Sequence, residues 1–194
     1  TKTIASPNRL GGRYKALIEN NSNLIKDSRI LDIASHDGRW SFSAIVNGAK
    51  HVVGIEGRDE LVKSSFENMK KYGIPEEKYA FYQGDIIQEI TKIKAGTVDI
   101  VFCFGFFYHT MHHLFLLSEI KRINPKYLIL DTGISQSIQS IIELKEESSE
   151  DPRNAISDPM SKSSSVVVGL PSKKAIEDML TSLGFSFVYY DWHK

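Results

Sequence analysis

Two short apolar runs, each associated with a carboxylate, constrain the fold of this chain most. The first run ends around Asp32, a turn that contains Gly38 follows, and a helical stretch leads to residues 52–55, which close on Glu56. In a βαβ unit, this arrangement brings the turn backbone and the N–H groups of the first helix into one crevice. The acid after the second strand can then accept hydrogen bonds from both ribose hydroxyls. The sequence therefore predicts a site for a nucleoside-containing cofactor.

The turn also restricts which nucleoside fits. A dinucleotide site uses a Gly-x-Gly-x-x-Gly turn so that the backbone can touch a pyrophosphate. In this turn the glycine is Gly38, and the neighbouring Asp37 would place a negative charge where phosphates lie. A pyrophosphate is therefore a poor ligand, whereas a cationic sulfonium with an amino acid tail is a better one.

Four segments resemble motifs I to IV of the class I S-adenosylmethionine-dependent methyltransferases. In chain order they are residues 31–38, Glu56, Gly84-Asp85-Ile86 and residues 98–105. The resemblance covers roughly residues 12–192 and implies S-adenosylmethionine as cofactor, with S-adenosylhomocysteine as product. The usual motif I is acid-x-Gly-x-Gly-x-Gly, but this chain has Ala34 and His36 at the first two glycine positions. His36 narrows the turn, so we expect it either to clash with the methionine moiety or to cover it.

The resemblance implies a cofactor site built from all four motifs. In the family, the first acid orders the amino end of the cofactor, the second binds the ribose and the third receives the adenine amino group. These acids are Asp32, Glu56 and Asp85 here, and the alternative for each is an ordinary turn or loop acid. Arg58 would cover an adenine face or remain a surface charge. The implied cofactor-binding residues are Asp32, Ala34, Ser35, His36, Gly38, Trp40, Glu56, Gly57, Arg58, Asp85, Ile86, Phe104 and Gly105.

Aromatic and histidine residues follow the fourth expected strand, where the methyl group would leave the cofactor. Tyr108 and His109 are the candidate catalytic residues, because histidine titrates near neutrality and methylation of oxygen or nitrogen requires proton removal. A helix cap or a packed polar side chain is the alternative for His109. If residues 110–123 are helical, His109, His112 and His113 share a face. No carboxylate stands at matching spacing, so we expect no metal site.

The same segment, together with the helix start at Pro171-Ser172, looks most like the wobble-uridine carboxymethyltransferases of tRNA and their small relatives. Those proteins use a similar Gly-x-x-Tyr-His after strand four. This chain has 24 lysines and arginines against 24 aspartates and glutamates, so no global field attracts nucleic acid. A small-molecule acceptor is therefore expected, and a nucleic acid partner is possible but not favoured.

Composition indicates a single domain over residues 1–194, in which residues 1–28 form an arm and a helix. Cys103 is the single cysteine and lies in an apolar strand, so we expect it to pack rather than react. The chain shows no leader and no long apolar span, which predicts a cytoplasmic protein without membrane contact. The sequence gives no indication of the oligomeric state.

Alternating strands and helices predict an α/β fold, with a doubly wound, mostly parallel Rossmann-like sheet of the class I methyltransferase type. Strands are expected at 29–34, 51–56, 79–83, 98–104 and 126–131, and helices at about 14–20, 40–47, 59–71, 112–123 and 172–183. Residues 1–12 read as an arm. Residues 132–170 read as a lid or substrate-binding insertion, with a helix through Ile134, Ile138, Ile141 and Ile142, a mobile flap and a short strand at 164–170. A last strand is expected at 185–192.

The favoured hypothesis is transfer of a methyl group from S-adenosylmethionine to an oxygen or nitrogen of a small acceptor. A second enzyme of the same fold would cleave or rearrange the cofactor, which the irregular turn at His36 motivates. A third possibility is a non-catalytic methyltransferase-like subunit. A dinucleotide-binding oxidoreductase is disfavoured by the missing glycines and by Asp37.

Overall fold

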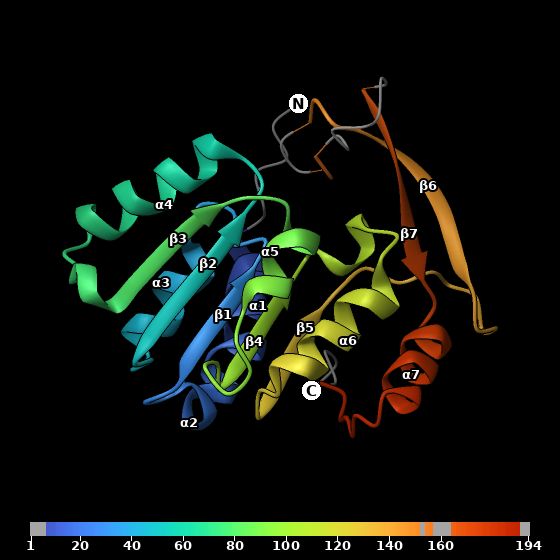
Figure 1. Cartoon of the computed structure of the whole chain (residues 1–194), viewed down its shortest axis with the longest axis horizontal. Coiled ribbons are helices and arrows are strands. Elements are labelled where there is room, and N and C mark those ends of the chain that lie inside the picture. The colour runs from blue at the N-terminus through green and yellow to red at the C-terminus, as the bar shows by residue number, and fades with distance from the viewer. Residues whose placement is uncertain (1–6, 152–153, 157–163, 191–194) are drawn as a thin grey trace.

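A five-stranded parallel sheet forms the centre of the molecule (Figure 1). The computed structural model describes residues 7–151, 154–156 and 164–190. The sheet consists of β1 (Arg29–Ile33), β2 (His51–Glu56), β3 (Tyr79–Gln83), β4 (Ile100–Phe104) and β5 (Tyr127–Asp131). Its order is β3-β2-β1-β4-β5. Strands β2 and β3 are therefore added on one side of β1, and β4 and β5 on the other, so the switch point of the sheet lies between β1 and β4. Open α/β sheets bind ligands outside the carboxyl ends of the strands at such a point.

Helices cover both faces of this sheet, as the doubly wound prediction requires. The α-helices are α1 (Pro7–Leu17), α2 (Ser22–Ile25), α3 (Arg39–Val46), α4 (Asp59–Lys71), α5 (Ile86–Lys92), α6 (His113–Ile123) and α7 (Lys173–Ser182). Alternate strand residues face opposite ways. Ile30 and Phe102 therefore pack with α1 to α3, whereas Leu31, Val101 and Cys103 pack with α5 to α7. The predicted fold class is confirmed.

Cys103 packs in the core, as expected. It is 1 % exposed, and burial raises the pKa of its thiol to about 12, so the thiolate is absent at neutral pH. The four predicted helices around 40–47, 59–71, 112–123 and 172–183 are also confirmed, each within one or two residues.

The insertion after β5 differs from the prediction. The isoleucines at helical spacing do not lie on a helix, and Ile138 is 94 % exposed. Instead, β6 (Ile142–Ser148) pairs antiparallel with β7 (Ser165–Pro171), which is the strand expected at 164–170, shifted by one residue. Seven residue pairs connect the two strands, and this long-range pairing outweighs the local helical pattern. We call β6, β7 and the described residues between them the hairpin; it stands beside the sheet in Figure 1.

Both ends of the described chain also correct the prediction. The expected arm at 1–12 is helical from Pro7, because Ala16 and Leu17 pack on the sheet and organise α1, while residues 1–6 lie outside the described residues. The expected strand at 185–192 is not formed within residues 185–190, which have no regular secondary structure, and residues 191–194 are not described. Helix α5 was not predicted. Its seven residues bury Ile86 and Ile90, and its N-cap is Asp85, whose carboxylate accepts from the N–H of Gln88.

In the part of the chain that the structure describes there are also three 3₁₀ turns: η1 (Glu19–Asn21), η2 (Glu76–Lys78) and η3 (Phe107–His109). Within the described residues, no helix combines the length and the apolar character needed to cross a membrane.

Candidate functional site

A cavity of about 520 Å³ opens at the carboxyl ends of the parallel strands, beneath the hairpin. Its size lies in the usual range for small-molecule sites. Most residues expected at the site line this cavity: Ala34, His36, Trp40, Glu56, Gly57, Arg58, Asp85, Ile86, Phe104, Gly105, Tyr108 and His109. The other three expected residues, Asp32, Ser35 and Gly38, are absent from the lining. The strand-end pattern therefore brings distant motifs together around one space.

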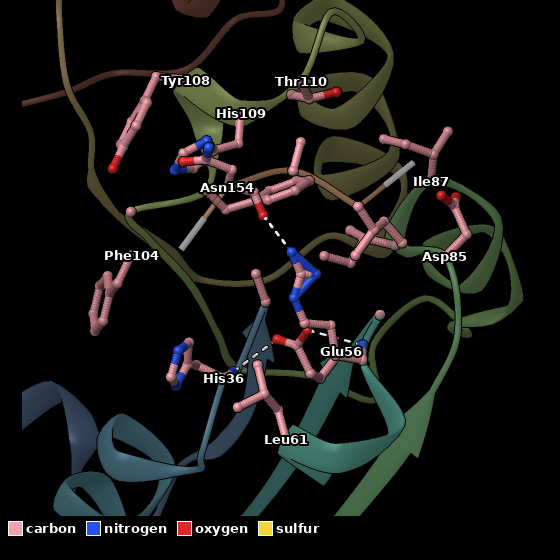
Figure 2. Close-up of a pocket in the computed structure, with 18 of the residues that line it drawn as sticks. His36, Glu56, Leu61, Asp85, Ile87, Phe104, Tyr108, His109, Thr110 and Asn154 are labelled. Atoms are coloured by element: carbon pink, nitrogen blue, oxygen red, sulfur yellow. Dashed lines mark hydrogen bonds between the residues drawn. The ribbon is translucent and has the colours of Figure 1, made fainter. Parts of the chain in front are cut away.

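The turn after β1 keeps a glycine-type backbone although two glycines are missing. Ala34, His36 and Gly38 have φ of 55°, 53° and 76°, all in the left-handed region. Glycine adopts this region without steric cost, and other residues rarely do. The turn therefore has the backbone shape that motif I requires, with the His36 side chain on the cavity wall (Figure 2).

Glu56 is held in place by that same turn. Its Oε2 accepts from the backbone N–H of His36 at 2.9 Å, and its Oε1 accepts from the N–H of Arg58 at 3.0 Å (Figure 2). The residue is 8 % exposed. Hydrogen bonds to both oxygens fix the direction of the carboxylate. A preorganised acceptor thus stands at the end of β2.

Asp32 is buried and does not line the cavity. It is 1 % exposed, and Ser41 at the start of α3 donates a 2.6 Å hydrogen bond to its Oδ2. Burial raises the pKa of Asp32 to about 7; the Ser41 bond opposes this rise and the nearby charge of Glu56 adds to it. The carboxyl group is therefore close to half-protonated at neutral pH.

His109 makes a short hydrogen bond to a residue of the hairpin. Its Nδ1 lies 2.6 Å from Oε2 of Glu147 on β6, and the two side chains are 11 % and 17 % exposed. The Tyr108 ring lies against the imidazole, with centroids 4.0 Å apart. Burial raises the pKa of the Tyr108 hydroxyl, and the charge of Glu147 adds to this. Tyr108 is thus a hydrogen-bond donor at neutral pH, and His109 is the group suited to accept a proton.

The sequence did not single out Glu147 or Arg13, which both shape this site. Arg13 on α1 lines the cavity, forms an ion pair with Asp131 and lies 5.0 Å from the centroid of the Trp40 ring. Its segment was expected to be partly an arm, and Glu147 was expected in a flap. A strand pattern in residues 142–148 opposite 165–171 would have been the signal for Glu147.

The hairpin is anchored to the loop that follows Glu56. The Arg58 guanidinium donates to the carbonyl oxygens of Asp151 at 3.0 Å and Asn154 at 3.1 Å. At Gly57, an added Cβ would lie 2.7 Å from the Cδ1 atom of Ile156, so the hairpin packs directly on this glycine. Arg58 therefore binds the hairpin backbone in this structure (Figure 2).

The three neighbouring histidines do not share a helical face. Helix α6 begins at His113, so His109 belongs to η3 instead. The His113 ring bonds to the carbonyl of Gly169 at 3.0 Å, and burial lowers its pKa. Among the described residues, no group of three histidine, cysteine, aspartate or glutamate side chains is arranged to hold a metal ion.

Comparison with known proteins identifies the family. A family model described as a methyltransferase domain matches residues 24–181, which is most of the chain. The chain belongs to the methyltransferase domain family. The resemblance to class I S-adenosylmethionine-dependent methyltransferases is thereby confirmed, and S-adenosylmethionine is the cofactor of that class.

Sequence relatives of this methyltransferase domain include tRNA U34 carboxymethyltransferases. The protein from Helicobacter pylori (strain HPAG1) is 28 % identical over 120 residues, or 60 % of this chain and 45 % of the relative. The protein from Helicobacter acinonychis (strain Sheeba) matches with the same identity and coverage. The chain thus spans less than half the length of these curated relatives.

Solved structures agree with the fold. The N-terminal domain of EvdMO1 with S-adenosylhomocysteine bound is 18 % identical, with a TM-score of 0.64 over 92 % of this chain and 70 % of that one. The [4+2]-cyclase SpnF is 14 % identical, with a TM-score of 0.61 over 93 % of this chain and 60 % of that one. At these identities the likeness concerns the fold alone, so the reaction must be argued from the site.

Proposed function

We propose that this methyltransferase domain binds S-adenosylmethionine in the cavity and transfers its methyl group to an oxygen or nitrogen of a small-molecule acceptor. The observation that carries the proposal is the Glu56 carboxylate, fixed at the end of β2 by two backbone N–H groups. A fixed acceptor pair matches the two adjacent hydroxyls of a ribose. Asp85, at the start of α5, lies on the same cavity and would receive the adenine amino group.

The methionine tail of the cofactor would then extend from Glu56 along the turn after β1 toward β4. The Gly105 backbone borders this path, and the nearest atom to an added Cβ there is the guanidinium Nη2 of Arg13, at 3.7 Å. Arg13 offers a cation for the carboxylate of the tail. The sulfonium would face the aromatic side chains of Trp40 and Phe104, which suit a positive charge.

His109 and Tyr108 would then serve the acceptor on the far side of the sulfur. Methyl transfer makes a carbon–heteroatom bond, breaks the carbon–sulfur bond and leaves the electron pair on sulfur as a neutral thioether. The acceptor's proton passes to the imidazole of His109, while Tyr108 donates a hydrogen bond that orients the acceptor. Because the sulfonium is already activated, alignment and exclusion of water supply most of the remaining rate enhancement.

The charges around the cavity favour a small acceptor over RNA. Three arginines line it: Arg39 is paired with Asp37, Arg58 binds hairpin carbonyls, and Arg13, which also contacts Asp131, would be taken by the carboxylate of the cofactor. RNA binding depends on cations that can neutralise several phosphates. The relatives named as tRNA enzymes nevertheless make tRNA the natural competitor in an experiment.

The test uses S-adenosylmethionine labelled in its methyl group. The protein is incubated with a small-metabolite extract and, separately, with total tRNA, and label is followed into each fraction. We expect transfer into the small-metabolite fraction that is lost in His109→Gln. Label in tRNA instead would replace the small acceptor by a nucleic acid, and no transfer to either fraction by protein that binds the cofactor would contradict methylation of such acceptors.

A further inference from the structure

The hydrogen bond between His109 and Glu147 joins the acceptor side of the cavity to the hairpin. The two residues are 38 positions apart, and they approach because β6 places Glu147 over η3. Both side chains are largely shielded from solvent. A carboxylate at 2.6 Å from Nδ1 accepts the proton carried by that nitrogen. This contact therefore determines the tautomer of the imidazole.

We propose that Glu147 is a positioning residue that holds His109 as the Nδ1–H tautomer. The lone pair on Nε2 is then free to take the proton from the methyl acceptor. The inference rests on the proposed function and names a residue that it requires. Carboxylates act on histidine in this way in hydrolytic triads and in metal sites. When Nε2 takes the proton, the resulting imidazolium is balanced by the Glu147 carboxylate.

Glu147 is itself fixed in two ways. The backbone N–H of Ala155 donates to the same Oε2 at 3.1 Å, and the β6 backbone at Glu147 pairs with Val166 on β7. The Tyr108 ring restrains the imidazole through its own contact. Among the described residues, His109 Nε2 has no hydrogen-bond partner, which is the state that a base awaiting its substrate needs.

Other charged groups near His109 are already paired. Arg13 on α1 and Asp131 at the end of β5 form an ion pair with each other. Glu147 is thus the carboxylate that acts on His109 directly, and it reaches the site on the hairpin. The proposed base is complete when the hairpin is seated, and Arg58 helps to seat it from the Glu56 loop.

The test reads the tautomer directly by long-range ¹H–¹⁵N correlation of the histidine rings above neutral pH. The chain has six histidines, and the His109 signals are assigned by their loss in His109→Gln. In the wild-type protein we expect a pyrrole-like Nδ1 and a pyridine-like Nε2. In Glu147→Gln the Nε2–H form, which free histidine favours, should become the major species.

A matched control is Glu146→Gln, which alters the neighbouring carboxylate of β6; that carboxylate bonds weakly to Ser165 at 3.4 Å. It should leave the His109 signals unchanged. An Nε2–H tautomer in the wild-type protein overturns the proposal, and so does a folded Glu147→Gln protein with the wild-type pattern. The wild-type spectrum decides the matter if that variant does not fold.

Once an acceptor is known, Glu147→Gln should lower kcat by about 10-fold to 100-fold with little change in the affinity for S-adenosylhomocysteine. An unchanged kcat would contradict the role. Failure of the wild-type protein to bind S-adenosylhomocysteine in calorimetry would instead remove the proposed function, while the tautomer would still show whether Glu147 orients His109. The two failures are therefore distinguishable.

Discussion

The two sides of the cavity are built by different kinds of contact. On the cofactor side, Glu56 accepts from His36 and Arg58, and Asp85 accepts from Gln88, all within 20 residues along the chain. On the acceptor side, Glu147 is 38 residues from His109, and Asn154 is 96 residues from Arg58. The carboxylates of the cofactor side are thus held within one βαβ unit and one helix start, whereas the acceptor side depends on where the hairpin docks.

This difference indicates that the two sides can vary independently. The strand ends fix the cofactor groups as part of the folded sheet, so loss of those groups should damage the core or the nucleoside site. The hairpin is not hydrogen-bonded into the parallel sheet; it is held by the Arg58 hydrogen bonds and by the packing of Ile156 and Val168, so its sequence can change without altering the strand pairing of that sheet. The following predictions test that separation, beginning with the largest effect.

Replacing the proposed base should affect the acceptor side alone. His109→Gln is expected to lower kcat for methyl transfer by about 10² to 10⁴, since it removes general base catalysis. Its affinity for S-adenosylhomocysteine, measured by calorimetry, should stay within about twofold of wild type because His109 lies away from Glu56. His51→Gln, at the start of β2, is the control. Equal loss of cofactor affinity and kcat in the His109 variant would contradict the independence of the cofactor side and the acceptor side.

Asp32 tests the cofactor side through pH. Its pKa is raised to about 7 in the folded protein, against about 3.9 when unfolded, so the folded state binds the proton more tightly. This contribution to stability is therefore complete below about pH 4 and is lost as pH rises through about 7.

The corresponding measurement is chemical denaturation of wild type and Asp32→Asn between about pH 4 and pH 8. As pH rises, the free energy of unfolding of the asparagine variant should increase relative to that of wild type. The change should be roughly 4 kcal/mol at most, because the pKa of Asp32 differs by about three units between the folded and unfolded states, at 1.36 kcal/mol each. Asp59→Asn on the exposed surface of α4 serves as the control. A stability difference that does not depend on pH would contradict the buried, proton-binding state of Asp32.

Gly38 tests how strictly the turn needs its left-handed backbone. Gly38→Ala should reduce the free energy of unfolding by about 1–3 kcal/mol, from backbone strain and from contact of the new Cβ with Ser65 and Phe81 at 3.1 and 3.2 Å. Gly73 also has a positive φ, but a Cβ added there would have no atom within 4 Å, so Gly73→Ala measures the effect of backbone strain alone. Denaturation midpoints that match for the two variants would show that the turn tolerates the side chain.

Arg58 tests the docking of the hairpin. Arg58→Ala removes two hydrogen bonds of about 3.0 Å to hairpin carbonyls, and we expect proteolytic cleavage within residues 149–156 to become about tenfold faster. The free energy of unfolding of the sheet should change by less than about 1 kcal/mol. Lys63→Ala, an exposed cation on α4, is the control. Cooperative loss of the whole fold would show that hairpin and sheet are one unit.

The same contrast explains what the sequence could predict. Five strands and four helices follow from apolar periodicity, and Glu56 and Asp85 follow from their places just after strands. The helix expected through Ile134, Ile138, Ile141 and Ile142 was wrong: Ile142 begins β6, which pairs with a segment more than 15 residues away, and the three isoleucines before it lie outside any helix.

Individual residues show the same limit. Glu147 lies on a strand that was missed because the isoleucines at helical spacing predicted a helix and a flap there, and Arg13 reaches the cavity because α1 packs on the sheet. Asp32 does not line the cavity, and the hydrogen bond that its carboxyl group accepts from the Ser41 hydroxyl was not predicted. Side-chain partners that come from other elements are set by packing, which a single sequence does not display.

Titration of S-adenosylhomocysteine into the protein tests the central claim most directly. The account predicts one-to-one binding to the wild-type protein, at least about tenfold weaker binding to Glu56→Gln because the ribose loses its charged acceptor, and unchanged binding to Glu60→Gln on the exposed start of α4. Absence of binding to the wild type, or equal affinity of Glu56→Gln and wild type, would contradict it.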